Sequence, residues 1–489
     1  MSVSALKRLA GSPFARSVGV LASGTAVGQG LIILASLALT RLYSPEDFGS
    51  FAVFSATLFC LLQLASMRYD WAVLVPESDR EAASLLVLSL GIATAVSAVT
   101  GGAVLLWGDR LTRWTNSPSL APHLWLLPVS LWAAGIYQAF NAWCTRRKSF
   151  HHVAWSQVSQ NLARVVFQIG LGFLHPGALG LMAGDVVGRW AGAGELAARA
   201  RRDDPGALSG VRAKEVFKAA SRYRRFPLFS SGASLLHQAG LQLTPLLIAV
   251  LYGAPVAGWY SLGQRVVGLP LVTVGNSISQ VYAGHASELA RNDAPALRRL
   301  FLKTSLVLGL AGSVPFGLMA VLGPWLFSAV FGREWVETGR YFQVLAPMCL
   351  VQLVVVPLAQ TLAILERQSV QLGWDVVRLA LMVGVFVASW YGGLSPYHAI
   401  ALFGGAMTAA YIVLYLLMLS GVARGEGSPD SGEGSPDSGE GSPSSGEGSP
   451  SSGEGSPDSG EGSPDSGEGS PNSGEGSPNR GERSPEFLA

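Results

Sequence analysis

Long apolar stretches recur along most of this chain, separated by short segments rich in proline, glycine and charged residues. A hydrocarbon core about 30 Å thick needs about 20 mainly apolar residues per helix. Dividing the chain at its proline, glycine and charge clusters predicts an all-α membrane protein with about twelve transmembrane helices. The predicted spans are residues 17–40, 49–68, 82–107, 121–143, 152–174, 177–198, 227–252, 256–281, 302–323, 341–364, 370–391 and 397–421.

The distribution of lysine and arginine supports this division, because these residues collect in the loops that face the cytoplasm. With the N-terminus inside, the inner segments hold 23 of them and the outer loops hold 5. A missed or additional helix would exchange the sides of every later loop and reduce that difference. The pattern therefore predicts a multi-pass protein with both termini in the cytoplasm, whose first span is a signal-anchor helix that is not cleaved.

The densest basic cluster lies at residues 199–226 and separates six predicted spans from six, as expected of a connector between two transporter halves. A weak parallel repeat with a common offset of 209 residues agrees with this division. Its four pairs are Leu42 and Leu251, Tyr43 and Tyr252, Gly49 and Gly258, and Phe51 and Tyr260. The predicted organisation is an N-terminus at 1–16, a six-helix bundle at 17–198, a basic cytoplasmic connector at 199–226, a second six-helix bundle at 227–424, and a tail at 425–489.

Composition separates the tail from the rest of the chain. The whole sequence is 49% hydrophobic and 13% charged, with a mean hydropathy of +0.36, whereas residues 425–489 repeat a Gly-Glu-Gly-Ser-Pro-Asp-Ser unit. Such a segment cannot bury a core, so we expect a disordered cytoplasmic tail, with a docking arm for cytoplasmic partners as the alternative.

The sequence shows no signature of a soluble enzyme. It has no phosphate-binding glycine loop, no nucleophile elbow and no metal-spaced histidines or cysteines. A net charge of +2 gives no reason to expect nucleic acid as a partner. We therefore predict a protein that is not an enzyme and uses no cofactor or metal.

Ionisable residues within the spans are the candidate functional groups, because a charge in the bilayer is unfavourable unless it is paired or hydrated. Arg164 and Arg265 fall roughly 14 to 18 Å from the nearer interface of their spans, close to the midplane. No acid accompanies either residue on its own helix, so each requires a hydrated cavity or an acid on another helix. An excess of cations in a central cavity suits a phosphate-bearing cargo, since arginine forms forked hydrogen bonds to phosphate.

Two further arginines are spaced to pair with an acid on the same helix. Asp185 and Arg189 are four residues apart, and Asp375 and Arg378 are three apart. These pairs either fasten helices together or serve as coupling or cavity ion pairs. A ladder of glycines around Asp185 permits close helix packing, and several polar residues of the first and seventh spans either face the same cavity or link helices. The ladder is Gly180, Gly184, Gly188 and Gly192, and the polar residues are Ser23, Thr25, Gln29, His237, Gln238 and Gln242.

Several segments resemble a known family. Residues 39–54, LTRLYSPEDFGSFAVF, are similar to the hallmark segment of the polysaccharide flippases, the oligosaccharide branch of the multidrug/oligosaccharidyl-lipid/polysaccharide exporter superfamily. The second half adds further similar stretches, and the resemblance extends over residues 13 to about 422. These stretches are residues 257–265 with Pro270, 287–289, 331–335 and 345–347.

The resemblance implies two six-helix bundles around a V-shaped central cavity that alternates between the two sides of a bacterial inner membrane. It implies a flippase for undecaprenyl-diphosphate-linked oligosaccharides of O-antigen, capsule or exopolysaccharide, with Arg265 as a cavity arginine that engages the diphosphate. It also implies a proton or sodium counter-ion, for which Asp185 and Asp375 are candidates, contact with membrane lipids, and a possible complex with a glycan polymerase. The alternatives are a multidrug or metabolite exporter of the same superfamily and a membrane glycan polymerase or ligase.

Overall fold

The computed structural model describes residues 13–174, 177–206, 211–224, 226–227 and 231–423, and within these residues it contains helices and no strand. The predicted N-terminus at 1–16 therefore lies mostly outside the described residues, and the tail at 425–489 lies entirely outside them. The all-α prediction is confirmed for the described part of the chain.

Six long helices cover the first half, each over one predicted span, and a four-residue helix and a 3-10 turn join some of them. They are α2 (Pro13–Leu42), α3 (Pro45–Ala65), α4 (Tyr69–Ala72), α5 (Asp79–Trp114), the turn η1 (Pro118–His123), α6 (Leu126–Arg146), α7 (Phe150–Leu174) and α8 (Ala178–Asp203). The basic connector contains one short helix, α9 (Ala213–Arg222).

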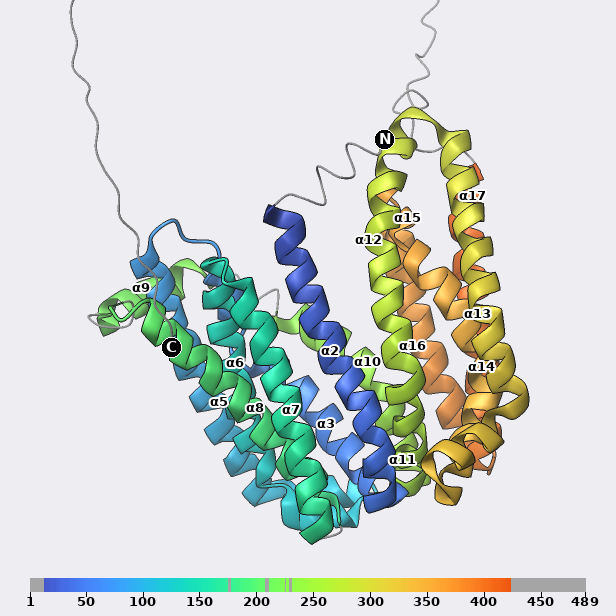
Figure 1. The fold of residues 1–489 in the computed structure, drawn as a ribbon, viewed down its shortest axis with the longest axis horizontal. Helices are drawn as coiled ribbons and strands as arrows, with labels where there is room; N and C mark the ends of the chain where they lie inside the picture. The colour runs from blue at the N-terminus through green and yellow to red at the C-terminus, as the bar shows by residue number, and fades with distance from the viewer. Residues whose placement is uncertain (1–12, 175–176, 207–210, 225, 228–230, 424–489) are drawn as a thin grey trace, which may run out of the picture. The chain divides into compact units, whose positions relative to one another are not determined.

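The second half repeats this pattern, with two of its spans interrupted. A π-helical turn, η3 (Gln264–Gly268), divides the eighth span, and the tenth span is interrupted at Ala359, two residues after Pro357. The helices are α10 (Ser231–Tyr252), α11 (Ala254–Gly263), α12 (Leu269–Asn292), α13 (Ala294–Phe331), α14 (Val336–Leu358), α15 (Gln360–Ile364), α16 (Gln368–Tyr391) and α17 (Pro396–Ala423), with a 3-10 turn η4 (Arg333–Trp335) before α14. Figure 1 shows α2 to α8 in blue and green and α12 to α17 in yellow and orange as two groups of helices.

The start of α3 shows how local sequence sets a helix boundary. Ser44 Oγ accepts a hydrogen bond from Asp47 N at 3.2 Å, and the Asp47 carboxylate accepts one from Ser44 N at 2.9 Å. This reciprocal pair satisfies two backbone donors at the helix end. Pro45, the first helical residue, needs no hydrogen-bond partner there. The Ser-Pro-Glu-Asp stretch therefore ends the connection from α2 and begins α3 within three residues.

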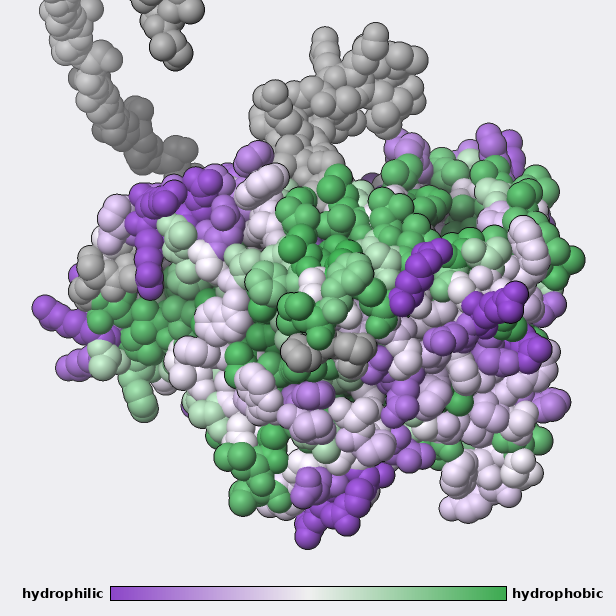
Figure 2. All heavy atoms as spheres, turned by 60° about the horizontal axis from the view of Figure 1, so that its bottom comes forward, coloured by the Kyte–Doolittle hydropathy of each residue, from purple (hydrophilic) through white to green (hydrophobic). Residues whose placement is uncertain are grey.

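Within the described residues, seven helices are long and apolar enough to cross a membrane. They are Pro45–Ala65, Asp79–Trp114, Ala254–Asn292, Ala294–Phe331, Arg333–Ile364, Gln368–Tyr391 and Pro396–Ala423. The other predicted spans are also helical but carry more polar residues or a shorter apolar stretch. Large apolar side chains face outward, including Leu105 at 88% exposure and Val314 at 73%. Figure 2 shows broad hydrophobic areas on one face of the molecule, as a lipid-facing surface requires.

Glycines bring α8 into close contact with α7. A Cβ added at Gly184 would lie 2.9 Å from Gln168 N and 3.0 Å from Arg164 O, and one added at Gly188 would lie 2.7 Å from Gln160 O. Two backbones approach this closely only where side chains are absent. The glycine ladder thus fixes the facing surfaces of α7 and α8, which carry Arg164 and Asp185.

Candidate functional site

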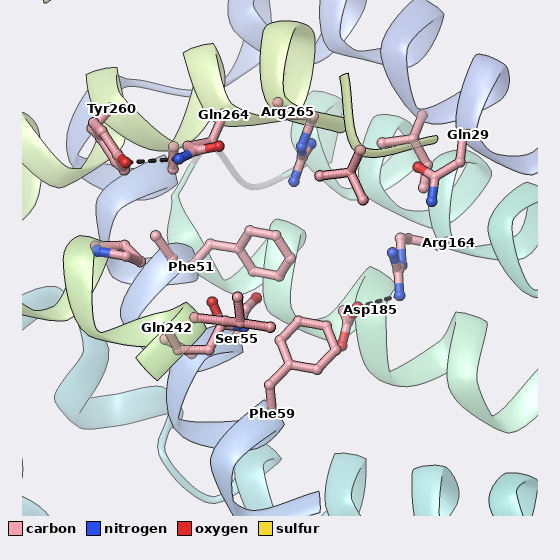
Figure 3. A pocket seen from close by; sticks show the side chains of 18 of the residues that line it. Gln29, Phe51, Ser55, Phe59, Arg164, Asp185, Gln242, Tyr260, Gln264 and Arg265 are labelled. Carbon is pink, nitrogen blue, oxygen red and sulfur yellow. Dashed lines mark hydrogen bonds and ion pairs between the residues drawn. The ribbon is translucent and has the colours of Figure 1, made fainter. Parts of the chain in front are cut away.

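A cavity of about 440 Å³ lies between helices of both halves of the chain. Its wall includes α2, α3, α7 and α8 from the first half, and α10, α11, η3 and α12 from the second (Figure 3). The residues labelled in Figure 3 are Gln29, Phe51, Ser55, Phe59, Arg164, Asp185, Gln242, Tyr260, Gln264 and Arg265.

Asp185 is the centre of a buried charge cluster on one side of this cavity. Its carboxylate accepts a contact from Arg164 Nη2 at 2.6 Å and a hydrogen bond from Arg189 Nε at 2.7 Å. The side chain of Asp185 is only 2% exposed, against 18% for Arg164. Ser130 Oγ lies 3.5 Å from the same carboxylate. The acid that Arg164 requires is therefore supplied by the neighbouring helix α8.

Arg164 keeps an unused hydrogen-bond donor. Its Nε is buried and has no hydrogen-bond partner among the described residues. A buried N–H without a partner is unfavourable and rare in folded proteins. Arg164 lines the cavity with other parts of its side chain, which is 18% exposed, whereas Nε itself is buried.

Arg265 lies in the π-helical turn η3 and lines the other side of the cavity. Its guanidinium carbon is 5.5 Å from the ring centre of Phe48 and 5.7 Å from that of Phe51, both on α3. A cation above an aromatic ring gains some electrostatic stabilisation. In the described part of the chain, no acid lies within ion-pair distance of Arg265.

The charged residues in the described lining are Arg164, Arg189, Arg265 and Asp185. Three arginines against one aspartate leave an excess of two positive charges at neutral pH. The rest of the wall combines aromatic rings with hydroxyl and amide groups, and Gln264 Nε2 donates to Tyr260 Oη at 2.7 Å. Such a surface can bind a ligand that has an anionic group at one end and many hydroxyl groups elsewhere.

The pair Asp375 and Arg378 lies elsewhere. Arg378 Nη2 is 3.7 Å from Asp375 Oδ1, and the Asp375 side chain is 45% exposed. Gln371 Nε2 donates to Asp375 at 3.3 Å, and the Arg378 guanidinium lies 5.3 Å from the Trp374 ring centre. Neither Asp375 nor Arg378 lines the cavity that contains Arg265.

Sequence reasoning found part of the polar wall and missed its aromatic part. Gln29 and Gln242 line the cavity, whereas Gln238 does not; the side chains of Ser23, Thr25 and His237 lie outside the described residues. Phe51, Phe59, Tyr260 and Gln264 were not expected there. The repeat was a signal for two of them, since Phe51 and Tyr260 are equivalent positions of the two halves and face the same cavity.

At the end of α3 nearest Ser44, the two halves meet without a gap. A Cβ added at Gly49 would lie 1.7 Å from Ala254 O, and one added at Gly258 would lie 1.7 Å from Pro45 O. Trp335, which is fully buried, donates through Nε1 to Thr40 O at 3.0 Å. Equivalent glycines of the repeat thus let α3 and α11 touch, and this contact closes the predicted outer side.

The described residues contain no group of three histidine, cysteine or carboxylate side chains able to hold a metal ion.

Comparison with known proteins gives the family of the chain. Residues 38–340, more than half of the sequence, match the family described as polysaccharide biosynthesis protein. The chain belongs to that family.

Curated relatives agree with the family assignment. The lipopolysaccharide biosynthesis protein WzxC of Escherichia coli (strain K12) is 23% identical over 378 residues, which cover 74% of this chain and 71% of that protein. The amylovoran biosynthesis protein AmsL of Erwinia amylovora is 23% identical over 182 residues, 36% of this chain and 46% of AmsL.

Solved structures share the fold of this family member. An inward-facing multidrug resistance MATE family transporter of the MOP superfamily superposes with a TM-score of 0.64 at 14% identity, covering 81% of this chain and 96% of that one. The lipid II flippase MurJ, in an inward closed conformation, also gives 0.64, at 12% identity, covering 82% and 87%. The protein is therefore a multi-pass membrane protein with a transporter fold of two helical halves.

Proposed function

We propose that this protein is a flippase that moves diphosphate-linked oligosaccharide lipids across the bacterial inner membrane by alternating access. The observation that carries the proposal is the excess of two positive charges in a cavity between the halves. A diphosphate brings a comparable negative charge, and arginine binds phosphate oxygens through paired hydrogen bonds. The family assignment and the similarity to biosynthesis proteins of lipopolysaccharide and amylovoran support a glycan precursor as the cargo.

The cavity residues take different roles in this proposal. Arg265 supplies the charge that attracts the diphosphate, because no acid in the described residues neutralises it. Arg164 adds a second positive charge to the wall, while its ion pair with Asp185 holds the guanidinium in place. The hydroxyl and amide groups of Ser55, Gln242 and Gln264 suit the sugar hydroxyls.

Alternating access requires that the contacts on the predicted outer side open. With both termini in the cytoplasm, the Gly49–Gly258 contact and the Trp335–Thr40 hydrogen bond face the outside. Opening them while the inner ends of the halves approach would release the cargo outward. A proton or sodium ion would bias this cycle by binding at a carboxylate, and Asp185 and Asp375 are the proposed candidates. In this cycle the protein moves its cargo without chemistry, so we propose a transporter and not an enzyme, with a glycan polymerase as a partner that receives the product.

Replacing Arg265 tests the charge requirement. We expect Arg265→Ala to abolish surface polymer in cells that depend on this protein and to leave lipid-linked repeat units on the inner leaflet. Arg265→Lys keeps the charge but loses the forked hydrogen bonds, so we expect partial export. The control is Arg113→Ala, at the predicted outer surface, where Arg113 Nε donates to Asp109 O in its own helix and to no other described residue.

The readouts are surface glycan on gels and flipping of a labelled diphosphate-linked oligosaccharide in vesicles that contain the purified protein. Full export by the alanine variant would remove Arg265 from the mechanism. Drug efflux without any change in surface glycan would instead favour the exporter alternative.

A further inference from the structure

A second cavity, of about 580 Å³, lies on the far side of α3 from the charged one. It separates α3 from the outer half of α5, and Leu127 of α6 forms part of its wall. Its lining is almost entirely apolar, with Arg110 as the charged exception among the described lining residues. Nothing in the proposed transport of a glycan precursor uses this cavity.

The α5 wall of the cavity includes small side chains. Near its middle α5 packs closely against α6, where a Cβ added at Gly135 would lie 2.7 Å from the Ala93 Cβ. Farther along, the residues that face α3 include the small side chains Thr100 and Ala103, which leave space. The residues at the rim are open to the outside of the bundle, with Val99 at 73% and Trp114 at 75% exposure.

The length of the cavity matches one leaflet of a membrane. Its α5 wall runs from Val99 to Trp114, which at 1.5 Å per residue is roughly 20 Å. Half of a hydrocarbon core is about 15 Å deep. The cavity is therefore long enough to hold the whole acyl chain of a lipid that enters from the side.

The outer end of the cavity carries the groups that recognise a lipid headgroup. Arg110 lies one turn before the end of α5, and no described residue forms a hydrogen bond or ion pair with its side chain. Trp107 and Trp114 flank it and are 53% and 75% exposed. Tryptophan at the interface and a free arginine above an apolar slot together suit a phosphate with a hydrocarbon tail.

We propose that this cavity binds one phospholipid of the outer leaflet, with an acyl chain between α3 and α5 and its phosphate at Arg110. The occupant touches α3 through Thr57 and Leu61. The opposite face of α3 carries Phe51 and Phe59 of the charged cavity. The lipid thus supports the helix that forms one wall of the transport pathway.

Two substitutions separate the headgroup contact from the acyl slot. Arg110→Gln removes the charge, and Ala103→Trp fills the space that the chain would occupy. Each has a matched control on the same helix outside the lining: Arg113→Gln for the charge, and Leu105→Trp, at a position 88% exposed, for the added ring. The full chain is purified in detergent, stripped of lipid and titrated with phosphatidylglycerol, and bound lipid is counted by native mass spectrometry.

We expect one phosphatidylglycerol to bind the unmodified protein and both controls equally. Arg110→Gln should weaken binding about fivefold, as expected for one arginine near an anionic headgroup, and Ala103→Trp should abolish it. Equal binding by all five proteins would overturn the proposal. Equal binding of inorganic phosphate or dihexanoyl phosphatidylglycerol would also overturn it, because no long acyl chain would then be needed. Binding of polyprenyl phosphate without binding of phosphatidylglycerol would overturn it as well.

Discussion

Asp185 is the acid that pairs with arginines in the central cavity. It contacts two arginines, one from its own helix and one from α7, and is nearly inaccessible. Removing one member of a buried ion pair leaves an uncompensated charge, which is more harmful than replacing the whole pair. Asp185 is therefore a structural requirement as well as a candidate for coupling.

We expect Asp185→Asn to lower the free energy of unfolding by about 3 kcal/mol, because Arg164 and Arg189 would then repel each other without an anion between them. Thermal unfolding of the purified protein measures this loss. Asp109→Asn, at an exposed position near the outer end of α5, is the control and should unfold like the unmodified protein. If Asp185→Asn were as stable as that control, the cluster would not contribute to stability, and a role limited to transport would remain.

At the scale of the helix, contact between α7 and α8 depends on glycine. We expect Gly184→Ala to destabilise the protein by about 1 to 3 kcal/mol, since the new Cβ would lie 2.9 Å from Gln168 N. Gly194→Ala, on the same helix with no atom within 4 Å of its Cβ, should be neutral or stabilising by up to about 1 kcal/mol. Melting temperatures compare the two, and equal values would show that α7 and α8 tolerate greater separation.

Helix α9 is attached to α5 by exposed ion pairs. Arg80 donates to both carboxylate oxygens of Glu215, at 2.7 and 3.1 Å, and Arg222 Nη1 contacts Glu81 at 3.0 Å. The hydrogen bonds from Arg80 lower the pKa of Glu215. The stabilisation is therefore present above the pKa of an unfolded glutamate and is lost as the pH falls through the lowered pKa of Glu215.

We accordingly expect Glu215→Gln to be slightly less stable than the unmodified protein at pH 7, and the difference to disappear once the pH falls below the lowered pKa of Glu215. Melting temperatures over a pH series in detergent measure it. The difference is small because both partners are exposed. If the difference in melting temperature between the two proteins persisted or grew in acid, the carboxylate of Glu215 would not be the stabilising group.

For the whole molecule, the contact between Gly49 and Gly258 joins the two halves. We expect Gly49→Ala or Gly258→Ala to force α3 and α11 apart, since each new Cβ would lie 1.7 Å from a carbonyl oxygen. The outer side should open more often. Gly91→Ala, with no atom within 4 Å, is the control.

Labelling from outside the cell detects this opening. Ser55 lines the cavity, so Ser55→Cys, with the native cysteines replaced, should react several times faster with an impermeant thiol reagent in the Gly49→Ala background. Labelling rates as low as those of the Gly91→Ala background would show that this contact does not close the outer side.

Local sequence patterns were sufficient to predict the positions of the helices. Membrane spans are set by consecutive apolar residues and by the charges between them, so each predicted span is helical in the described residues, with the eighth and tenth spans each divided between two helices. The repeat was also readable, because Gly49 and Gly258 are equivalent by sequence alone, and the family resemblance in residues 39–54 agrees with the family match.

Tertiary packing decided which charges meet. The spacing of Asp185 and Arg189 predicts their contact, but only the close approach of α7 and α8 brings Arg164 to the same carboxylate. Among the described residues, Arg265 has no acid within ion-pair distance, and its guanidinium lies over Phe48 and Phe51 of α3. Asp375 and Arg378 are spaced to pair on one helix, but neither of them lines the charged cavity. Spacing along a chain reports neighbours on one helix, whereas a cavity is formed by several helices whose relative rotation depends on every contact between them.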